Sequence, residues 1–438
     1  MRRKDVLFLC QFFYPEYNSS ATLPWDTARF FAQQNLKVKA LCGYPKEYCT
    51  QANLPLKEVV ENVEIQRLKY WQLSRKSAVG RLLNFFSFTL AVLLHLPILR
   101  EYRCIIVYSN PPVLPFVTIL SKWLFGTKII FVSYDVYPEI AYASNSLKPN
   151  GLLAKVMRLL NRCFFKTVDQ VVALTEEMRQ FLLAHRLSLK PKQVQVIPNW
   201  AHESLKLQDD SLIDHSLLKK LGWGKDAFVV SYFGNMGICQ ELSTLLSTIQ
   251  RLQNHERICF LFVGHGNKKA WLKAQTADLK NVCVLDFLTG EDFEQALRLS
   301  ACSVVSLEKG LRGLCAPSKY YSYLQAGLPV ISITEKSSYL AKEIEKMAIG
   351  QAFTHGDSQN LADTLKRWSN SPEKMLQMRN AAKAYYQENY AKAIGLDQYY
   401  QMVRKVLESD EVTDNSDYLN EKRSSQYQAL YRFFRWLS

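Results

Sequence analysis

Short apolar runs that alternate with helix-like stretches constrain the fold of this chain more than any other feature. Each run has the length of a buried β-strand, ends in a turn-forming or polar segment, and is followed by a helix-like stretch. The alternation predicts parallel, doubly wound α/β domains, in which crossover helices cover both faces of each sheet. The runs form two series, at residues 6–12, 38–42, 104–109, 129–134, 171–174 and 194–197, and at residues 229–233, 258–263, 282–287, 303–307 and 330–333.

A polar segment separates the two series. The sequence IPNWAHESLKLQDDS breaks the rhythm near Asn199, and 438 residues of which 48% are hydrophobic can build two large cores. We therefore predict one Rossmann-like domain over residues 1–198 and a second over residues 199–385. Residues 386–407 are expected to form a C-terminal helix able to cross back to the N-terminal domain, and residues 408–438 a polar linker with an aromatic and basic tail.

Two strand, turn and helix segments in the second domain carry the strongest functional signal. They read FVVSYFGNMG over residues 228–237 and PSKYYSYLQAGLPV over residues 317–330. A tight turn between a strand and a helix directs backbone N–H groups toward the mouth of a parallel sheet, where an anion can bind. The two segments together suggest a nucleotide-sugar site in which a diphosphate is the bound anion.

Charge and cysteine content narrow the partners and the compartment. The net charge of +15 favours an anionic partner, namely nucleic acid, a phosphorylated substrate or an acidic membrane surface. The basic residues are dispersed and no nucleic-acid-binding signature is present, so we do not expect nucleic acid to be a partner. The ten cysteines contain no CxxC pair or zinc-site spacing, which is typical of reduced cysteines in a cytosolic protein.

Two segments suggest contact with a membrane. Residues 79–99 are mostly apolar and flanked by basic residues, but Asn84, His95 and Pro97 interrupt the run. A helix that lies on the bilayer and a helix buried against the sheet both fit this pattern better than a membrane-spanning one. Residues 425–438 mix aromatic side chains with Arg432 and Arg435, which suits an interfacial anchor or docking onto the protein itself.

A series of motifs, in order from Cys10 to about Glu388, resembles glycosyltransferase family 4 and its GT-B fold. The segments are FFYPEYNSSATLPWDTARFFAQQ, YSNPP, SYDVYPE, VIPNW, FGNMGICQELSTLL, FVGHGNKK, PSKYYSYLQAGLPV and GDSQNLADTL. Within the family, the chain is similar to bacterial enzymes that add a sugar, often an N-acetylated deoxysugar of the fucosamine type, to lipid-linked precursors of surface polysaccharide. The resemblance implies two Rossmann-like domains that face each other across a cleft.

The chain departs from the family pattern at charged positions. The family's Arg and Lys pair falls near Asn235 and Gln240, and its paired glutamates align with Leu314 and Ser322. Lys319, at the start of a predicted helix, is then the best remaining cation for the diphosphate, with Arg312 behind it. A lysine at this end opposes the helix dipole, which a bound phosphate would offset, although a solvated surface lysine is the alternative.

The resemblance implies a set of donor-binding residues around Lys319. Gly264 and Gly266 match the family's VGxG turn, while Phe287 and Leu288 follow the next strand, where the family's backbone meets the base. Asn235 and Gln240 are alternatively capping residues. The predicted donor-binding residues are Gly234, Asn235, Met236, Gly237, Gln240, Gly264, Gly266, Phe287, Leu288, Arg312, Ser318 and Ser322.

The acceptor side is predicted in the N-terminal domain. Asp135 and Glu139 lie just beyond a strand end, and the resemblance places Asp135 where a carboxylate accepts or orients the proton of the attacking hydroxyl. A turn-capping aspartate is the alternative for Asp135. The remaining acceptor-side residues, which occupy the family's glycine-rich loop without its glycines, are Tyr14, Asn18, Ser19 and Ser20.

These features predict a retaining, metal-independent glycosyltransferase of hexosyl or N-acetylhexosaminyl type. Its donor is expected to be a UDP-sugar, its acceptor a polyprenyl-diphosphate-linked precursor of capsule, O-antigen or exopolysaccharide, and it needs no cofactor. We expect it to be peripheral at the inner face of the bacterial plasma membrane. Two alternatives stay open: an inactive scaffold subunit of a polysaccharide assembly complex, and a sugar-nucleotide epimerase on the same fold.

Overall fold

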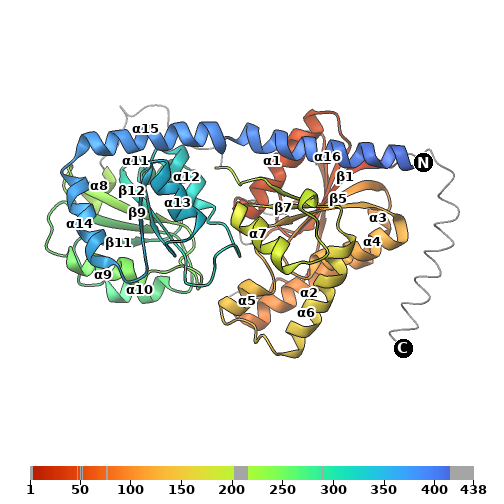
Figure 1. Ribbon diagram of the computed structural model, residues 1–438, viewed down its shortest axis with the longest axis horizontal. Helices are drawn as coiled ribbons and strands as arrows, with labels where there is room; N and C mark the ends of the chain where they lie inside the picture. The colour runs from red at the N-terminus through yellow and green to blue at the C-terminus, as the bar shows by residue number, and fades with distance from the viewer. Residues whose placement is uncertain are drawn as a thin grey trace. The chain divides into compact units, whose positions relative to one another are not determined.

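The computed structural model describes residues 3–46, 48–49, 51, 53–74, 77–201, 216–288 and 290–414 (Figure 1). The chain divides into two compact units. Unit 1 contains Met1–Pro198 and the C-terminal helix from Gly395, and unit 2 contains Asn199–Ile394. The aromatic tail predicted over residues 425–438, and most of the linker predicted before it, lie outside the described residues.

Unit 1 contains an eight-stranded sheet among its described residues, in the order β3-β4-β2-β1-β5-β6-β7-β8. All neighbouring strands are parallel except β3, which pairs antiparallel with β4. The strand order reverses between β1 and β5, so the loops after these strands diverge at a topological switch point. The strands are β1 Lys4–Cys10, β2 Val38–Gly43, β3 Lys57–Val60, β4 Val63–Leu68, β5 Tyr102–Tyr108, β6 Lys128–Ser133, β7 Gln170–Ala173 and β8 Val194–Val196.

Helices connect these strands and bury their apolar sides against the sheet. The helix α1 (Ser19–Gln33) buries Ala28 and Phe31 among β1 and β2 side chains, and Phe31 lies 5.8 Å from Phe8 between ring centroids. The other helices of residues 1–198 are α2 Ala78–Leu94, α3 Leu96–Leu99, α4 Val117–Phe125, α5 Glu139–Ala143, α6 Leu152–Thr167 and α7 Glu176–His185.

The hairpin of β3 and β4 was not predicted from the apolar runs. Its strands, KEVV and VEIQRL, mix charged with apolar residues, and Glu61 and Asn62 form the turn with positive φ angles of 46° and 65°. The β3 strand lies at the sheet edge and is half exposed, so its sequence lacks the continuous apolar run that marks the buried strands. The short edge strand β14 of unit 2 was missed for the same reason.

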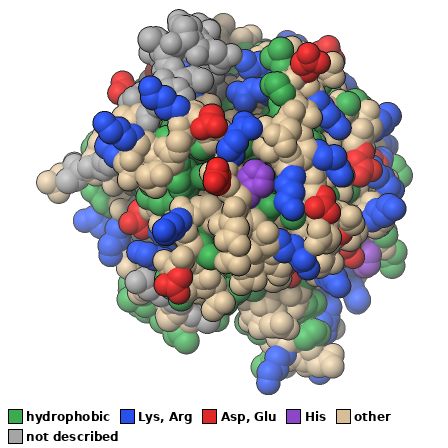
Figure 2. Space-filling model, turned by 90° about the vertical axis from the view of Figure 1, so that its left-hand side faces the viewer, with side chains coloured by type: hydrophobic (Ala, Val, Ile, Leu, Met, Phe, Trp, Pro, Cys, Tyr) green, Lys and Arg blue, Asp and Glu red, His purple; other side chains and the backbone are tan. Residues whose placement is uncertain are grey.

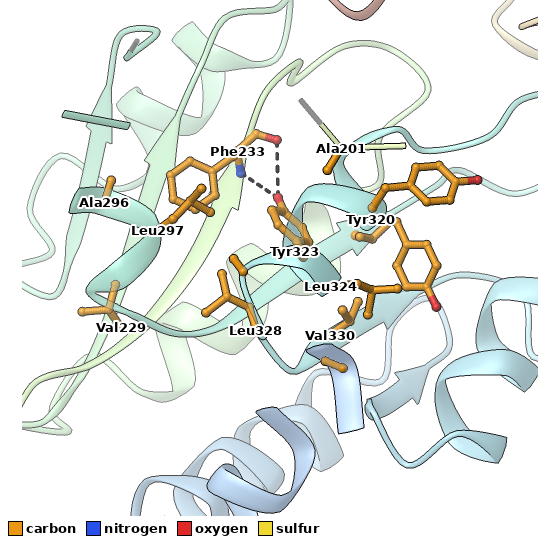
Figure 3. Packing of buried hydrophobic residues seen from close by; sticks show 14 of the residues in the cluster. Ala201, Val229, Phe233, Ala296, Leu297, Tyr320, Tyr323, Leu324, Leu328 and Val330 are labelled. Atoms are coloured by element: carbon orange, nitrogen blue, oxygen red, sulfur yellow. Dashed lines mark hydrogen bonds between the residues drawn. The ribbon is translucent and has the colours of Figure 1, made fainter. Parts of the chain in front are cut away.

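Unit 2 contains a six-stranded parallel sheet in the order β11-β10-β9-β12-β13-β14, with its switch point between β9 and β12. Alternate side chains of β9 enter cores on the two faces of this sheet: Val229 and Phe233 on one face, Val230 and Tyr232 on the other. Figure 3 shows the first of these cores, in which side chains of α11 and α12 pack around Phe233. The strands are β9 Phe228–Phe233, β10 Ile258–Val263, β11 Val282–Leu285, β12 Ser300–Ser306, β13 Val330–Ile333 and β14 Gly350–Phe353.

The helices of unit 2 follow the predicted pattern. Leu242, Leu245, Leu246, Ile249 and Leu252, predicted on one face of a helix, are all buried in the second core along α9. The described helices are α8 Ser216–Lys220, α9 Ser243–Arg251, α10 Lys269–Gln275, α11 Gly290–Arg298, α12 Lys319–Gln325, α13 Tyr339–Lys346, α14 Ser358–Ser369 and α15 Pro372–Asn389.

The C-terminal helices divide between the two units. The helix α15 packs on unit 2, whereas α16 (Lys392–Asp414) packs on unit 1, where the Tyr400 ring lies 6.1 Å from those of Phe30 and Phe31. Arg103 donates a hydrogen bond of 2.6 Å to the carbonyl of Leu407. Tyr390 still belongs to the core of unit 2. The helix that packs on unit 1 therefore begins at Lys392, six residues later than the sequence analysis placed it.

The apolar stretch 79–99 forms α2 and the short α3, and none of the described helices is long and apolar enough to cross a membrane. Asn84 does not interrupt α2, because it faces the protein and exchanges two hydrogen bonds with the backbone of Leu73, at 2.8 and 2.9 Å. His95 marks the end of α2 and bonds to the carbonyl of Ala91.

Candidate functional site

The loop after β9 and the loop after β10 pack backbone against backbone at the carboxyl edge of the unit 2 sheet. Gly264 has a φ of 151°, and a Cβ there would lie 2.0 Å from the carbonyl oxygen of Gly234. A Cβ at Gly266 would lie 2.4 Å from the carbonyl of Met236. The VGxG glycines therefore permit close approach of the two loops, and they also adopt angles that favour glycine.

Three of the four N–H groups from Gly234 to Gly237, directly after β9, already have acceptors within the protein. The N–H of Gly234 donates to the Val263 carbonyl at 2.8 Å, and that of Met236 to the His265 carbonyl at 2.6 Å. The N–H of Gly237 donates to Oε1 of Gln240 at 2.9 Å, so Gln240 caps the turn. This loop does not present a row of free N–H groups to an anion, and a cation has to supply most of the charge at this edge of the sheet.

Lys268 links the loops that follow β9, β10 and β12. Lys268 forms an ion pair of 2.6 Å with Glu308 after β12 and also donates to the carbonyl of Gln240. The Glu308 N–H donates to the carbonyl of Cys239 at 2.9 Å. Nothing in the sequence distinguished Lys268 from the adjacent Lys269, because the partner of each depends on how the loops converge.

Lys319 is the cation at the switch point of unit 2. Its Nζ is buried, donates no hydrogen bond to any of the described residues, and lies 3.5 Å from the centre of the Tyr232 ring. A Cβ at Gly234 would lie 4.0 Å from this Nζ, so the ammonium group sits beside the loop after β9. Burial lowers the pKa of Lys319 well below its ordinary value, although the ring face favours the charged form. An anion at this position would restore the charge that burial disfavours.

The position of Lys319 follows from how α12 is held. The Tyr323 hydroxyl accepts a hydrogen bond of 2.9 Å from the N–H of Phe233, at the end of β9 (Figure 3). One turn earlier in α12, the Tyr320 hydroxyl donates to buried Glu343 on α13 at 3.1 Å. Glu343 also accepts hydrogen bonds from the hydroxyls of Tyr339, Tyr385 and Tyr390. These contacts fix the first turn of α12 relative to β9, and thereby the Lys319 side chain.

The other predicted donor residues differ in burial and in contacts. Ser318 is the N-cap residue of α12 without a side-chain capping bond, and Ser322 is half-buried one turn later. Phe287 is exposed and faces the His265 ring at 6.0 Å, and Leu288 is partly buried in the core. Arg312 is exposed and donates to the Ser337 hydroxyl at 3.2 Å. Asn235 is exposed at the tip of its loop.

Asp135 lies at the carboxyl edge of the unit 1 sheet, directly after β6. The Ser109 hydroxyl, at the end of β5, accepts hydrogen bonds from the N–H groups of Tyr134 at 3.0 Å and Asp135 at 3.1 Å, which fixes the backbone there. The Asp135 side chain is half-buried, and no described residue donates a hydrogen bond to its carboxylate. Burial raises the pKa of Asp135 to about 6. The carboxylate does not cap its own turn, and at neutral pH it is predominantly ionised and free to accept a proton.

Asp135 lines a small pocket with an aromatic wall. Arg186 also lines the pocket, and its guanidinium pairs with both carboxylate oxygens of Glu139, at 2.9 and 2.6 Å. Glu139 is therefore engaged in holding α5 to the end of α7. The pocket is lined by Ser109, Pro112, Pro115, Phe131, Ser133, Asp135, Val136, Tyr137, Asn161, Phe164, Phe165, Leu182 and Arg186.

The loop after β1 carries the other predicted acceptor-side residues. Tyr14 lies against Trp25 with ring centres 4.6 Å apart, and its carbonyl accepts a hydrogen bond from Arg67. Asn18 is the N-cap residue of α1, and its Oδ1 is buried without a hydrogen-bond partner among the described residues. Ser19 and Ser20 begin α1. This loop thus brings two buried polar atoms without a partner among the described residues, Gln11 Oε1 and Asn18 Oδ1, to the unit 1 switch point.

The described residues contain no group of three or more His, Cys, Asp or Glu side chains arranged to hold a metal ion. All ten cysteines are free thiols, half of them buried.

Comparison with known proteins gives the class of this chain. Residues 26–200 match the glycosyl transferase 4-like domain, and residues 215–385 match glycosyl transferases group 1. The structure is similar to Anabaena HepE in complex with UDP, with a TM-score of 0.67 and 15% identity over 92% of this chain and all of HepE. It is also similar to sucrose-phosphate synthase from Thermosynechococcus elongatus, with a TM-score of 0.72 and 13% identity over 93% of this chain and all of the synthase.

The chain is a glycosyltransferase of GT-B type.

Among curated proteins, this glycosyltransferase is similar to the probable glycosyltransferase WbjE of Pseudomonas aeruginosa. The two are 27% identical over 315 residues, which cover 69% of this chain and 75% of WbjE. A further structural relative is WaaG, a glycosyltransferase involved in lipopolysaccharide biosynthesis, with a TM-score of 0.65 and 13% identity over 91% of this chain and 99% of WaaG.

Proposed function

We propose that this glycosyltransferase transfers a sugar, with retention of anomeric configuration and without a metal ion, from a UDP-sugar to a polyprenyl-diphosphate-linked precursor of surface polysaccharide. The observation that carries the donor half of the proposal is the buried Lys319 ammonium beside Gly234, for which the described part of the chain offers no hydrogen-bond partner. A diphosphate is the ligand that this arrangement fits, because it brings the negative charge that the site lacks. The UDP bound to HepE supports uracil as the base of the donor nucleotide.

Lys319 assists the leaving group in the proposed reaction. The bond between the anomeric carbon and the diphosphate oxygen breaks, UDP leaves with the electron pair, and the acceptor hydroxyl oxygen bonds to the same face of the sugar. Negative charge grows on the phosphate during this step, and an ammonium group held in place by α12 stabilises the transition state without reorganisation. Leu314 and Ser322 replace the family's glutamates, so no carboxylate is assigned as a nucleophile and a front-face displacement is proposed.

Asp135 serves the acceptor in this proposal. Its carboxylate orients the attacking hydroxyl and accepts the proton that the hydroxyl loses. A pKa of about 6 suits this role, because the group is ionised at neutral pH yet basic enough to take up a proton.

The acceptor and the compartment are inferred from relatives. WaaG, which is involved in lipopolysaccharide biosynthesis, supports a role in bacterial surface polysaccharide. The proposed lipid-linked acceptor lies at the cytoplasmic face of the plasma membrane. An N-acetylated deoxysugar is the proposed group transferred. Figure 2 shows basic and acidic side chains interspersed over the displayed face, which argues against a nucleic-acid stripe on that face.

Calorimetry of the purified protein against UDP-, GDP-, ADP- and dTDP-sugars tests the proposal. We expect one nucleotide class to bind, and Lys319→Ala to weaken binding by about 10- to 150-fold, since a hydrogen bond to a charged group contributes about 1.5–3 kcal/mol. Lys309→Ala, which removes the same charge from an exposed position in a nearby loop, should bind like the unsubstituted protein. Absence of binding by folded protein would favour a scaffold subunit.

A further inference from the structure

Helix α2 is apolar on both sides, but unit 1 buries only one of them. Asn84, Phe88 and Val92, spaced four residues apart, face the protein and are buried. The opposite side is exposed, up to 75% for Leu94, and the Trp71 indole beside the helix is 62% exposed. A helix that is apolar all round is ordinarily covered on both sides. The exposed large apolar side chains of α2 are Val79, Leu82, Leu83, Phe86, Leu90, Leu93 and Leu94.

Helix α6 exposes a second apolar row on the same unit. It buries Ala154, Met157, Phe164 and Phe165, whereas Leu152, Leu153, Val156 and Leu159 are exposed. The short helix α4 contacts both α2 and α6, and its Leu124 is also exposed. Figure 1 shows α2 in orange and α6 in yellow on the same side of the unit. We call the exposed apolar side chains of α2, α4 and α6, together with Trp71, the α2–α6 face.

The segment that carries the α2–α6 face is strongly basic. Residues 69–168 contain 13 Lys and Arg against three acidic residues, so this segment carries a net charge of +10 out of +15 for the chain. Residues 69–100 and 140–168, which include α2 and α6, contain no Asp or Glu. Lys155, Arg158, Arg162 and Lys166 of α6 are exposed beside its apolar row. The partner of this face must therefore accept apolar side chains in its centre and cations at its rim.

A bilayer with anionic headgroups has both properties. Apolar and aromatic side chains insert at the boundary between headgroups and acyl chains, and each nearby Lys or Arg is attracted to acidic lipid. A second copy of this chain would place a strongly basic surface against another one, which is unfavourable. The tail of residues 422–438 contains only basic charged residues, so it lacks the complementary charge as well.

We propose that the α2–α6 face docks this glycosyltransferase onto a bilayer that contains anionic lipid. The inference rests on the proposed function for its purpose, since a lipid-linked acceptor lies in that bilayer. Helix α6 connects the two: its first turns expose the apolar row, and its last turns bring Asn161, Phe164 and Phe165 to the pocket that contains Asp135. Docking through α6 holds this pocket close to the surface from which the acceptor comes.

Flotation of the full-length protein with vesicles tests the proposal. The protein should float with vesicles of equal parts phosphatidylcholine and phosphatidylglycerol, and bind at least about tenfold more weakly to phosphatidylcholine alone. Two apolar variants, Phe86→Ser with Leu90→Ser on α2 and Val156→Ser with Leu159→Ser on α6, should each reduce binding about tenfold or more. Lys155→Glu with Arg162→Glu should reduce binding to the anionic vesicles and make the remainder less sensitive to salt.

Matched controls distinguish binding through the α2–α6 face from nonspecific binding of exposed apolar side chains to vesicles. Leu187→Ser in unit 1 and Leu376→Ser in unit 2 each remove an exposed leucine outside the α2–α6 face and should leave flotation unchanged. Unchanged flotation in all three α2 and α6 variants would assign the vesicle contact elsewhere and overturn the proposal. So would a dimer in sedimentation velocity that the α2 variant converts to monomer. UDP-sugar calorimetry on the same samples keeps the two proposals apart, because lost nucleotide binding with intact flotation rejects only the proposed function.

Discussion

Two ionisable side chains of the candidate site are held in surroundings that disfavour their charged forms. Lys319 Nζ is buried beside an aromatic ring without a hydrogen-bond partner among the described residues, and the Asp135 carboxylate is half-buried without a donor. Such groups lower the stability of the folded protein, and they are found preferentially where a ligand or a reaction uses them. Each therefore predicts opposite effects of substitution on stability and on function.

Lys319→Met should stabilise the free protein while it weakens nucleotide binding. The folded-state pKa of Lys319 is lowered, so below its unfolded value the unfolded chain binds more protons, and stability rises as pH increases between the two pKa values. At neutral pH the variant removes this penalty, and we expect a higher melting temperature by calorimetry together with lost UDP affinity. Lys309→Met should change neither. A lower melting temperature for Lys319→Met would mean that Lys319 is a structural residue.

Asp135→Asn should stabilise unit 1 while it lowers transfer activity. The folded-state pKa of about 6 lies above the value for an unfolded aspartate, so stability falls as pH rises from about 4 to 6. We expect the variant to gain on the order of 1 kcal/mol in unfolding free energy at pH 8 and nothing at pH 3, discounted for partial exposure. Transfer activity should fall at least about 100-fold, because proton transfer contributes about that much.

The pH profile and a second aspartate check this interpretation. In the unsubstituted enzyme, kcat/KM should rise with pH through about 6 and lose this limb in Asp135→Asn. Asp169→Asn is the contrasting variant, since Asp169 accepts hydrogen bonds from Lys122 at 2.6 Å and from the Ile129 N–H at 2.7 Å. It should destabilise unit 1. A loss of stability in both variants would identify Asp135 as a capping residue.

At the scale of elements, the site depends on how closely two loops approach. The loops after β9 and β10 touch through backbone atoms at Gly264 and Gly266, and Lys268 with Glu308 joins them to the loop after β12. The strands themselves only bring these loops to one edge of the sheet. Their exact spacing is set by contacts between loops, so small changes in the backbone there should affect the whole unit.

Gly264→Ala should destabilise unit 2 by more than about 3 kcal/mol, because its Cβ would lie 2.0 Å from the Gly234 carbonyl and force the loops apart. Gly310→Ala is the matched control. Gly310 has a φ of 78° but no atom within 4 Å of its ideal Cβ, so its substitution should cost only about 1–2 kcal/mol for the left-handed backbone. Urea unfolding of both variants measures the difference, and equal losses would show that backbone angle alone matters at Gly264.

At the scale of the molecule, the C-terminal helix completes a unit whose strands come from the opposite end of the sequence. Tyr400 packs on Phe30 and Phe31, and Val403 is fully buried. Val403→Asp should therefore destabilise unit 1 by about 3 kcal/mol or more, because it buries an unpaired charge. Gln401→Glu, at an exposed position two residues earlier, adds the same charge; it loses the hydrogen bond of Gln401 to Asp397 and should cost only about 0.5 kcal/mol.

Hydrogen exchange locates the effect of Val403→Asp. Amide protection should fall in β1 and β5 of unit 1 and remain unchanged in β9 and β10 of unit 2. Equal loss of protection in both sheets would show that the two units unfold together.

The sequence alone determined the class of the fold, because buried parallel strands leave continuous apolar runs and crossover helices leave their own period between them. It also pointed to Lys319 and Asp135, since each follows a strand or turn whose pattern is local. It could not show the β3–β4 hairpin, whose edge strand is half exposed, nor that Gln240 and the neighbouring backbone accept hydrogen bonds from three of the four N–H groups directly after β9.

Only the tertiary structure decided which side of α2 is buried, which partners Lys268 and Glu139 have, and that the Lys319 ammonium has none among the described residues. These properties depend on contacts between residues far apart in the chain. The periodicity that predicts helices and strands, in contrast, is a pattern of a few neighbouring residues.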